Sequence, residues 1–481
     1  MSKRTKTLSF DSELKKIVHY CYSSSEFSTI TLKQAHIALL DAMSCALMSL
    51  QNNKCIRHLG PVVPDAELSN GARVPGTNFK LDPIQSSYNI SCMIRWLDYN
   101  DTWLAKEWGH PSDNIGAILS CADYHSRHSD TTYTMLDILS AMIKAYEIQG
   151  ILALENSFNA LGFDHVILVR IASTALSVML LGGNELQMLN ALSNAFADGV
   201  SLRVYRHGEN TEQRKSWAAA DASSRGVRHA IWAIHDEPGY ASVLSDNTWG
   251  FNHVVLKNQA LIIKQQYQHY VIDNILYKIC YPVEFHAQTA VECAIKLYEV
   301  FVEKYNADVS RILKIKIYTQ QAAMKIINKS GELRNAADRD HCIQYAVSIA
   351  LINGSLTTEH YHDNYALEKI NREKIRSITD KIIVYEDPIY TTDYYDNNKR
   401  AIANRIHILF DDQQEFIEEV IYPIGHSKRR KESLPLLEKK YVTAVSKHYS
   451  NEKTQSILNS NVNFDDFLAM TITEWMTLMQ N

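Results

Sequence analysis

The 481-residue sequence has little of what marks several large classes of protein. Glycine and proline are scarce, at 17 and 10 residues, which excludes a collagen-like, low-complexity or extensively disordered chain. The longest strongly apolar run, residues 171–183, is shorter than the roughly 18 residues that a membrane span requires. Acidic residues near the N-terminus precede any apolar stretch, so we expect no secretory signal or transit peptide, and a cytoplasmic location.

Clustered cysteines and net positive charge are also absent. The eight cysteines include no C-x-x-C pair, which argues against a zinc ribbon, an iron–sulfur cluster and a secreted disulfide framework. The 49 basic residues are outnumbered by 54 acidic ones, which argues against a nucleic-acid-binding protein. The glycine motifs of dinucleotide and P-loop sites, the H-E-x-x-H of zinc proteases and the G-x-S-x-G of hydrolases are all missing.

What the first part of the chain does contain is helical periodicity. Apolar residues recur four apart through residues 32–50. Asp82-Pro83 has the form of an N-cap followed by proline at the first helical position, and it predicts a helix running towards Asp98. Further helices are predicted over residues 134–147, ended by Gly150, and over residues 165–181.

After Tyr281 the pattern changes to a mixture of strands and helices. Apolar residues alternate over residues 312–317 and 402–410, and a short polar turn leads from the second of these strands to another at 416–422. Helices are predicted over 288–305 and 340–353, and again from Leu434 to the C-terminus. The terminal helices are too few for a core of their own. We therefore expect a mainly α protein in which helical segments, residues 1–280 and 426–481, flank an inserted α+β domain at 281–425.

The segment from Arg95 to Asn114 is the richest in candidate catalytic side chains. Asp98 and Thr102 are four residues apart, so they would share one face if the helix from Pro83 continued that far. Asp101 is then the better candidate for a capping residue. His110 precedes Pro111 and would lie at the positive end of a new helix, where the charged imidazolium is disfavoured. Such a ring can exchange protons near neutral pH.

Two other helix starts carry candidate residues. Asp164 can cap the helix that follows it, with His165 in the first turn; the alternative is a plain cap beside a surface histidine. Lys215 precedes a run of small residues, which suits close packing of two helices or close approach of a substrate. The lysine itself could clamp an anion or, if desolvated, transfer a proton.

Together with these residues, several longer stretches make the sequence recognisable. The segments RWLDYNDTWLAKEWGHPSDN, GFDH, SLRVYRHGENTEQRKSWAAADASSRG, ADRDHCIQY, RAIANRI and YPIGH occur in this order and together resemble the MmgE/PrpD family. The resemblance extends from near the N-terminus to the C-terminus without large gaps. It implies a large helical domain interrupted by a smaller α+β lid, an active site between the two, and a homodimer.

The resemblance also implies roles for individual residues. Its catalytic residues are Asp98, His110, His165 and Lys215, and its substrate-binding residues are Thr102, Lys278, Glu284 and His286. It implies no metal ion, no iron–sulfur cluster and no other cofactor.

The implied activity is the elimination of water from 2-methylcitrate to give 2-methyl-cis-aconitate, a step of the methylcitrate cycle of propionate catabolism, with some hydration of citrate and cis-aconitate. The stretch between Thr102 and His110 has the longer form of this branch rather than the shorter one of the cis-aconitate decarboxylases. Decarboxylation on the same fold, distinguished by release of CO₂ and itaconate, is one alternative. A non-catalytic helical scaffold, which no tricarboxylate would stabilise, is the other. The expected partner is a small tricarboxylate, with no nucleic acid or membrane.

Overall fold

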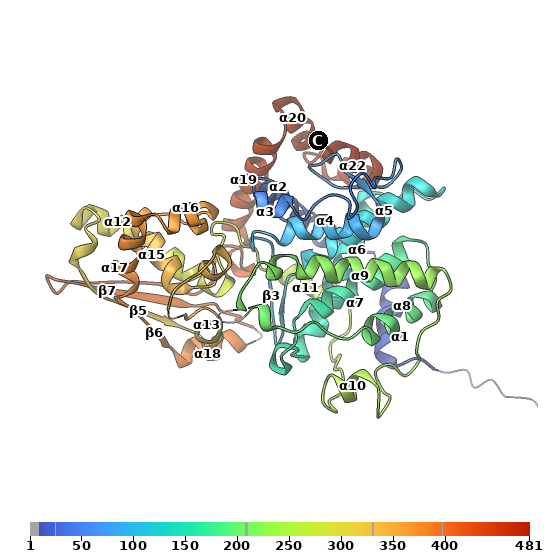
Figure 1. Cartoon of the computed structure of the whole chain (residues 1–481), viewed down its shortest axis with the longest axis horizontal. Helices are drawn as coiled ribbons and strands as arrows, with labels where there is room; N and C mark the ends of the chain where they lie inside the picture. The colour runs from blue at the N-terminus through green and yellow to red at the C-terminus, as the bar shows by residue number, and fades with distance from the viewer. Residues whose placement is uncertain (1–8, 25, 207–209, 330, 397) are drawn as a thin grey trace, which may run out of the picture.

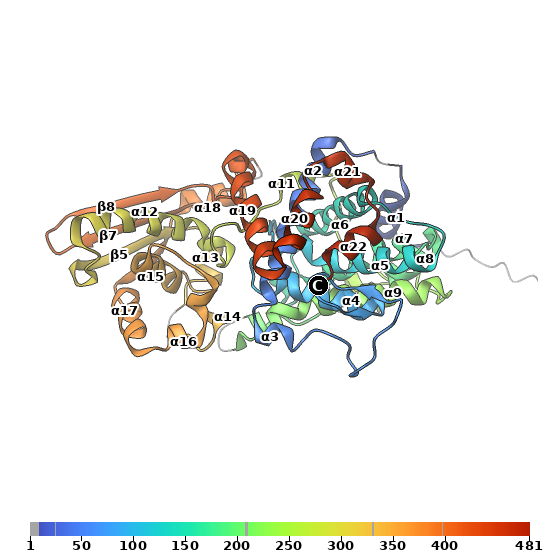
Figure 2. The same cartoon turned by 90° about the horizontal axis from the view of Figure 1, so that it is seen from above.

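The computed structural model describes residues 9–24, 26–206, 210–329, 331–396 and 398–481. Its chain is mainly helical and forms two bodies side by side, a larger all-helical domain and a smaller α+β domain (Figures 1 and 2). Each body has its own apolar core. One core draws on residues up to Ile279 and again from Leu437 to Met479, and the other draws on residues from Val283 to Val420.

The helical domain is built around one buried helix, α7 (Val166–Leu180), on which all but one of the side chains are buried. Neighbouring helices pack around α7, so its apolar sequence is explained by burial in the core of the domain. No helix in the described part of the chain is long and apolar enough to cross a bilayer. The helices that contact α7 are α1 (Ser12–Tyr22), α5 (Ile115–His128), α6 (Met135–Glu155), α8 (Glu185–Ala197) and α9 (Arg214–Ile234). Outside them, α4 (Pro83–Arg95) packs on α5 and α9, and α2 (Thr29–Ser49) packs on α4 and α6.

Local signals explain several boundaries in this domain. The predicted N-cap is confirmed at α4, where Asp82 Oδ1 accepts hydrogen bonds from the backbone N–H groups of Ile84 and Gln85 at 3.0 and 3.1 Å. The prediction that Gly150 ends a helix is wrong, because α6 continues to Glu155. A Cβ atom at Gly150 would lie 2.4 Å from Val271 Cγ2, so this glycine allows α11 (Tyr270–Asn274) to pack closely against α6.

The α+β domain contains a four-stranded sheet in the order β6-β5-β7-β8. Its strands are β5 (Ile312–Thr319), β6 (Ile382–Glu386), β7 (Asn404–Phe410) and β8 (Glu415–Val420). β5 pairs with β6 in parallel and with β7 antiparallel, and β7 forms the predicted hairpin with β8. Alternate side chains of β7 are buried, and α12 (Gln288–Tyr305) and α15 (Ile343–Asn353) lie above the strands in Figure 1.

Two features of this domain were missed. The sequence analysis predicts no strand at β6, whose burial is weak because it lies at the edge of the sheet. The helix predicted from Asp340 begins only at Ile343, which leaves Asp340 and His341 outside it. The other helices of this domain are α13 (Gln321–Ile326), α14 (Ala336–Arg339), α16 (Asp363–Ala366), α17 (Lys369–Thr379) and α18 (Pro388–Tyr395). The helical domain also contains the short helices α3 (Asn53–Ile56) and α10 (Phe251–Val254).

The C-terminal segment returns to the helical domain, where α19 (Arg430–His448) packs against α2 (Figure 1). The Lys440 ammonium group donates at 2.7 Å to Asp41 Oδ1 and at 2.9 Å to the backbone carbonyls of Tyr99 and Lys278. Lys440 therefore links α19 to α2, through Asp41, and to the segments around Tyr99 and Lys278, which lie next to the α+β domain. The last helices are α20 (Asn451–Asn459), α21 (Phe464–Ala469) and α22 (Ile472–Met479).

Candidate active site

The segment after α4 is folded differently from the expectation. The helix ends at Arg95, Asp98 has a φ of 49°, and Thr102 forms an isolated β-bridge with Leu276. Asp98 and Thr102 therefore do not share a helix face, and that prediction is wrong. The chain continues through a small hairpin, β3 (Trp103–Leu104) and β4 (Trp108–Gly109), to the 3₁₀ turn η1 (Pro111–Asn114).

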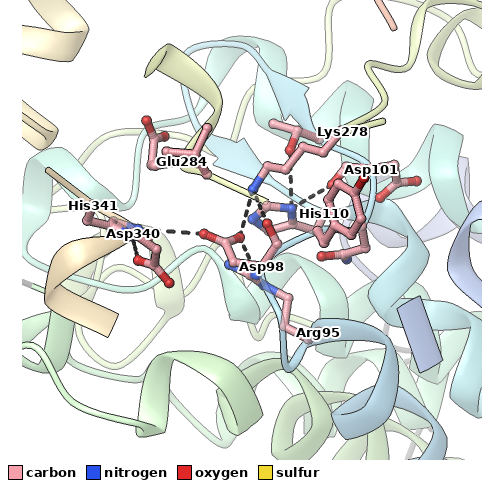
Figure 3. Close-up of polar contacts among 12 residues, drawn as sticks. Arg95, Asp98, Asp101, His110, Lys278, Glu284, Asp340 and His341 are labelled. Carbon is pink, nitrogen blue, oxygen red and sulfur yellow. Dashed lines mark hydrogen bonds and ion pairs between the residues drawn. The ribbon is translucent and has the colours of Figure 1, made fainter. Parts of the chain in front are cut away.

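Asp98 lies in a buried ionic cluster (Figure 3). Its Oδ1 accepts from Lys278 Nζ at 2.8 Å and forms an ion pair with Arg95 Nη1, while its backbone carbonyl accepts from Lys278 Nζ at 2.7 Å. These contacts hold the backbone in its left-handed conformation. Burial alone would raise the pKa of Asp98, but the positive charges of Arg95 and Lys278 hold that pKa well below its ordinary value of 3.8. Asp98 is therefore an anion at neutral pH.

The lid contributes the other half of this cluster. Asp340 Oδ1 accepts from Lys215 Nζ at 2.6 Å and also contacts His341 Nδ1, which lies 3.0 Å from the same ammonium group. His341 Nε2 lies 3.9 Å from Asp98 Oδ2. Burial lowers the pKa of Lys215, although the Asp340 carboxylate opposes the shift. Lys215, in the first turn of α9, is thus placed against the lid and not against solvent.

His110 is held in one tautomer. Its Nδ1 lies 2.6 Å from the backbone carbonyl oxygen of Asp101, which can only accept, so Nδ1 carries the hydrogen. Thr102 Oγ1 lies 3.4 Å from the same nitrogen. Burial, followed by the charges of Arg95 and Lys278, holds the pKa of His110 well below its ordinary value of 6.5. The neutral ring therefore presents Nε2 as a proton acceptor.

Neither Asp101 nor Asp164 is the N-cap residue of the helix that follows it. The N-cap residue of η1 is His110, and Asp101 instead accepts at its Oδ1 from the Ser112 backbone N–H at 3.2 Å, from a position well before the turn. The N-cap residue of α7 is His165, so the prediction that Asp164 caps this helix is wrong. The Asp164 carboxylate instead lies 2.9 Å from His165 Nδ1 and accepts from Arg206 Nε at 2.6 Å.

His165 lies beside His110, with ring centroids 5.8 Å apart. Burial lowers the pKa of His165 to about 4, so the ring is neutral. Its buried Nε2 has no hydrogen-bond partner among the described residues, and neither has Nη2 of Arg206. Since unpaired buried polar atoms are costly, these two nitrogens mark a place where a polar ligand would be favoured.

Glu284 and His286 lie where the chain enters the lid. The Glu284 carboxylate accepts from His286 Nδ1 at 2.8 Å and from the backbone N–H of His286 at 2.9 Å. Burial would raise the pKa of Glu284, but His286 and, more weakly, His341 and Lys278 lower it to about 2. Glu284 is therefore a fixed anion beside the cluster (Figure 3).

The structure thus gathers the eight predicted residues around the boundary between the domains. Sequence reasoning missed Arg95, Asp340 and His341 as site residues, and Arg206 as the partner of Asp164. Each of them lies within a segment already singled out for resemblance, such as Ala337–Tyr345 for Asp340 and His341. Charged or titratable side chains within these segments were the signal that could have identified them as site residues.

One group of side chains has a spacing that could suit a metal ion. Asp98, Asp340 and His341 offer ligand atoms within 4.8 Å of one another. However, Lys278 and Lys215 already donate to the two carboxylates, and a divalent cation would be brought next to these ammonium groups. The charge arrangement therefore disfavours a divalent cation at this position.

Two family models match the chain. The MmgE/PrpD N-terminal domain matches residues 15–263, and the MmgE/PrpD C-terminal domain matches residues 281–466. The chain belongs to the MmgE/PrpD family. Within it, the chain is 47% identical to the 2-methylcitrate dehydratase of Salmonella typhi, over 98% of this chain and 97% of that protein.

Relatives from other organisms show similar coverage. The chain is 46% identical to the 2-methylcitrate dehydratase of Cupriavidus necator, over 97% of each protein. It is 43% identical to the mitochondrial 2-methylcitrate dehydratase of Yarrowia lipolytica, over 97% of this chain and 90% of that one. The matched regions therefore extend over both domains of this chain.

Proposed function

We propose that the protein is a 2-methylcitrate dehydratase, a hydro-lyase that eliminates water from 2-methylcitrate to give 2-methyl-cis-aconitate in propionate catabolism. The observation that carries the proposal is the identity of 46–47% with curated 2-methylcitrate dehydratases over nearly the whole of both chains. The geometry supports the same chemistry, because a neutral imidazole lies beside a buried group of cations suited to carboxylates.

The elimination requires a base for the C–H proton next to a carboxylate and an acid for the departing hydroxyl group. We assign the base to His110, whose Nε2 is unprotonated because Nδ1–H is bound to the Asp101 carbonyl. As Nε2 takes the proton, the C–H electrons form the C=C bond and the C–O bond breaks. The hydroxyl leaves as water with a proton from Lys215, the buried ammonium group with a lowered pKa.

The other residues bind and orient. Lys278 and Thr102 bind substrate carboxylate or hydroxyl groups. Nε2 of His165 and Nη2 of Arg206, which have no hydrogen-bond partner in the part of the chain that the structure describes, bind a further carboxylate. Asp98 stays ionised and keeps Lys278 in place. Because fixed cations stabilise the charge that develops on the carboxylate next to the carbanion, the proposed reaction uses no metal or other cofactor.

We also propose that the protein acts as a homodimer in a reducing compartment, the cytoplasm. The compartment is supported by the eight cysteines, which are all free thiols and of which only Cys280 is not fully buried. The homodimer rests on the family resemblance, and light scattering at assay concentration tests it.

The function is tested with purified, chelator-treated protein and synthetic 2-methylcitrate, by following the ultraviolet absorbance of the conjugated product. We expect turnover without added metal. No turnover of 2-methylcitrate would refute the proposal, and release of CO₂ and itaconate from cis-aconitate would identify a decarboxylase instead. Activity lost on chelation and restored by iron would refute the metal-free mechanism alone.

A further inference from the structure

A tyrosine of the lid joins the two domains beside the active site. Tyr394, on α18, has its hydroxyl oxygen 3.1 Å from Trp108 Nε1 and 3.0 Å from His286 Nε2. Trp108 belongs to the helical domain and lies two residues before His110. The three side chains also pack together, with the His286 ring centroid 6.0 Å from Trp108 and 5.5 Å from Tyr394.

The direction of each hydrogen bond follows from the donors available. An indole N–H can only donate, so the Tyr394 oxygen accepts from Trp108. The Glu284 carboxylate can only accept, so Nδ1 of His286 carries a hydrogen and donates it to Glu284 Oε1 at 2.8 Å. In the neutral ring Nε2 is then an acceptor, and the Tyr394 hydroxyl donates to it at 3.0 Å. The contacts thus form one directed chain from Trp108 through Tyr394 and His286 to Glu284.

The end of this chain reaches the ionic cluster. The Glu284 backbone N–H donates to the Asp340 carbonyl at 3.1 Å, so the segments that carry Glu284 and Asp340 are joined. The Glu284 carboxylate acts electrostatically on Lys278 and His341. A change in the tautomer of His286 would remove the donor that orients this carboxylate, because Nδ1 would then present a lone pair to an anion.

We propose that Tyr394 is a positioning residue that supports the Nδ1–H tautomer of His286, and through it the orientation of Glu284, and that its contact with Trp108 links this arrangement to the seating of the lid. Tyr394 and Trp108 lie in different domains, so the chain of hydrogen bonds is complete only when the domains are in contact. The inference rests on the proposed dehydratase function, since it concerns the organisation of that active site.

The test compares kcat and KM for 2-methylcitrate in Tyr394→Phe and in a matched control, Tyr390→Phe. Tyr390 lies on the same helix, is also buried, and donates its hydroxyl hydrogen to Glu419, away from the site. We expect Tyr394→Phe to lower kcat by about ten- to a hundredfold, the range typical of groups that orient a functional side chain, with little change in KM. Tyr390→Phe should leave kcat unchanged. Full kcat in folded Tyr394→Phe would overturn the inference.

Double variants separate positioning from a general structural effect. In His286→Asn, the amide nitrogen can replace Nδ1 as donor to Glu284, but nothing replaces Nε2. Adding Tyr394→Phe to His286→Asn should therefore cause no further loss, and Trp108→Phe should cause none in a Tyr394→Phe background. Additive losses would overturn the inference.

A spectroscopic measurement keeps this inference separate from the function. Nitrogen-15 NMR of labelled histidine, with the His286 signals assigned from His286→Asn, should show the Nδ1–H tautomer in the wild type and a mixture in Tyr394→Phe. An Nε2–H tautomer in the wild type would overturn the inference, whatever the activity. Wild-type protein inactive on 2-methylcitrate but with the expected spectra would refute the function alone.

Discussion

Replacing His110 by asparagine tests the central chemical assignment with the least change to the fold. The asparagine amide nitrogen can take the place of Nδ1 and keep the hydrogen bond to the Asp101 carbonyl, which is 2.6 Å long in the wild type. Only the proton-accepting Nε2 is lost. A positioned base contributes about 10²- to 10⁴-fold, so kcat should fall by that factor, which is about 2.7–5.4 kcal/mol of transition-state stabilisation.

The assay is the initial rate of the absorbance increase from 2-methylcitrate, together with thermal unfolding of the same preparations. His36→Gln is the matched control, because His36 is also a buried histidine with one hydrogen bond, from Nε2 to Asn461 at 2.8 Å. The control should keep its kcat. A His110→Asn variant that is folded and retains kcat within a factor of a few would refute the role of His110 as base.

The pH dependence gives a second check on the same residue. Because burial and the nearby cations hold the pKa of His110 well below 6.5, the ring is unprotonated throughout the neutral range. The base is lost only when the pH falls through this lowered value. The acid limb of kcat/KM, which reports the free enzyme, should therefore lie well below pH 6.5. An acid limb at or above pH 6.5 would contradict the burial argument.

Two further predictions concern charge. Asp98→Asn should destabilise the fold at pH 7 by about 3–5 kcal/mol in denaturant unfolding, because Arg95 and Lys278 would be left buried without an anion. Since the pKa of Asp98 is depressed, its contribution is present above its ordinary value of 3.8 and lost as the pH falls through the folded value, so the difference should shrink only at acid pH. Binding of unreactive propane-1,2,3-tricarboxylate should take up protons, because an anion raises the lowered pKa values of His110 and His165. Calorimetry in two buffers of different ionisation enthalpy measures this, and proton release would contradict it.

Elements with a strong local signal were predictable from the sequence. The helix α12 has the predicted bounds, and the hairpin of β7 and β8 follows from alternation and a polar turn. The errors have tertiary causes. A glycine in a helical pattern predicts the end of the helix. Gly150 instead lies within α6 and allows close contact with α11, which comes from a distant segment of the chain. The edge strand β6 is specified mainly by its pairing with β5, and a local sequence pattern does not predict pairing with a distant strand.

The same distinction applies to the site. His110 could be found from the proline that follows it, because the chain at that point is set by local geometry. Arg95 and His341 could not, because their roles depend on which charges the two domains bring together. An arginine at the end of an amphipathic helix is ordinary, and it becomes part of the site only through its contact with Asp98.

The charges of the cluster are divided between the domains in a way that suits a trianionic substrate. The helical side carries Arg95, Lys278 and Lys215 against the single carboxylate of Asp98, whereas the lid side brings the carboxylates of Asp340 and Glu284. Separating the domains would therefore leave an excess of positive charge on the helical side, which attracts a tricarboxylate. Asp340 Oδ1 accepts from Lys215 Nζ at 2.6 Å, and Lys215 is the acid of the proposed reaction. A substrate group that binds Lys215 competes with this lid carboxylate, so substrate binding and the placement of the proposed acid are coupled through one ion pair.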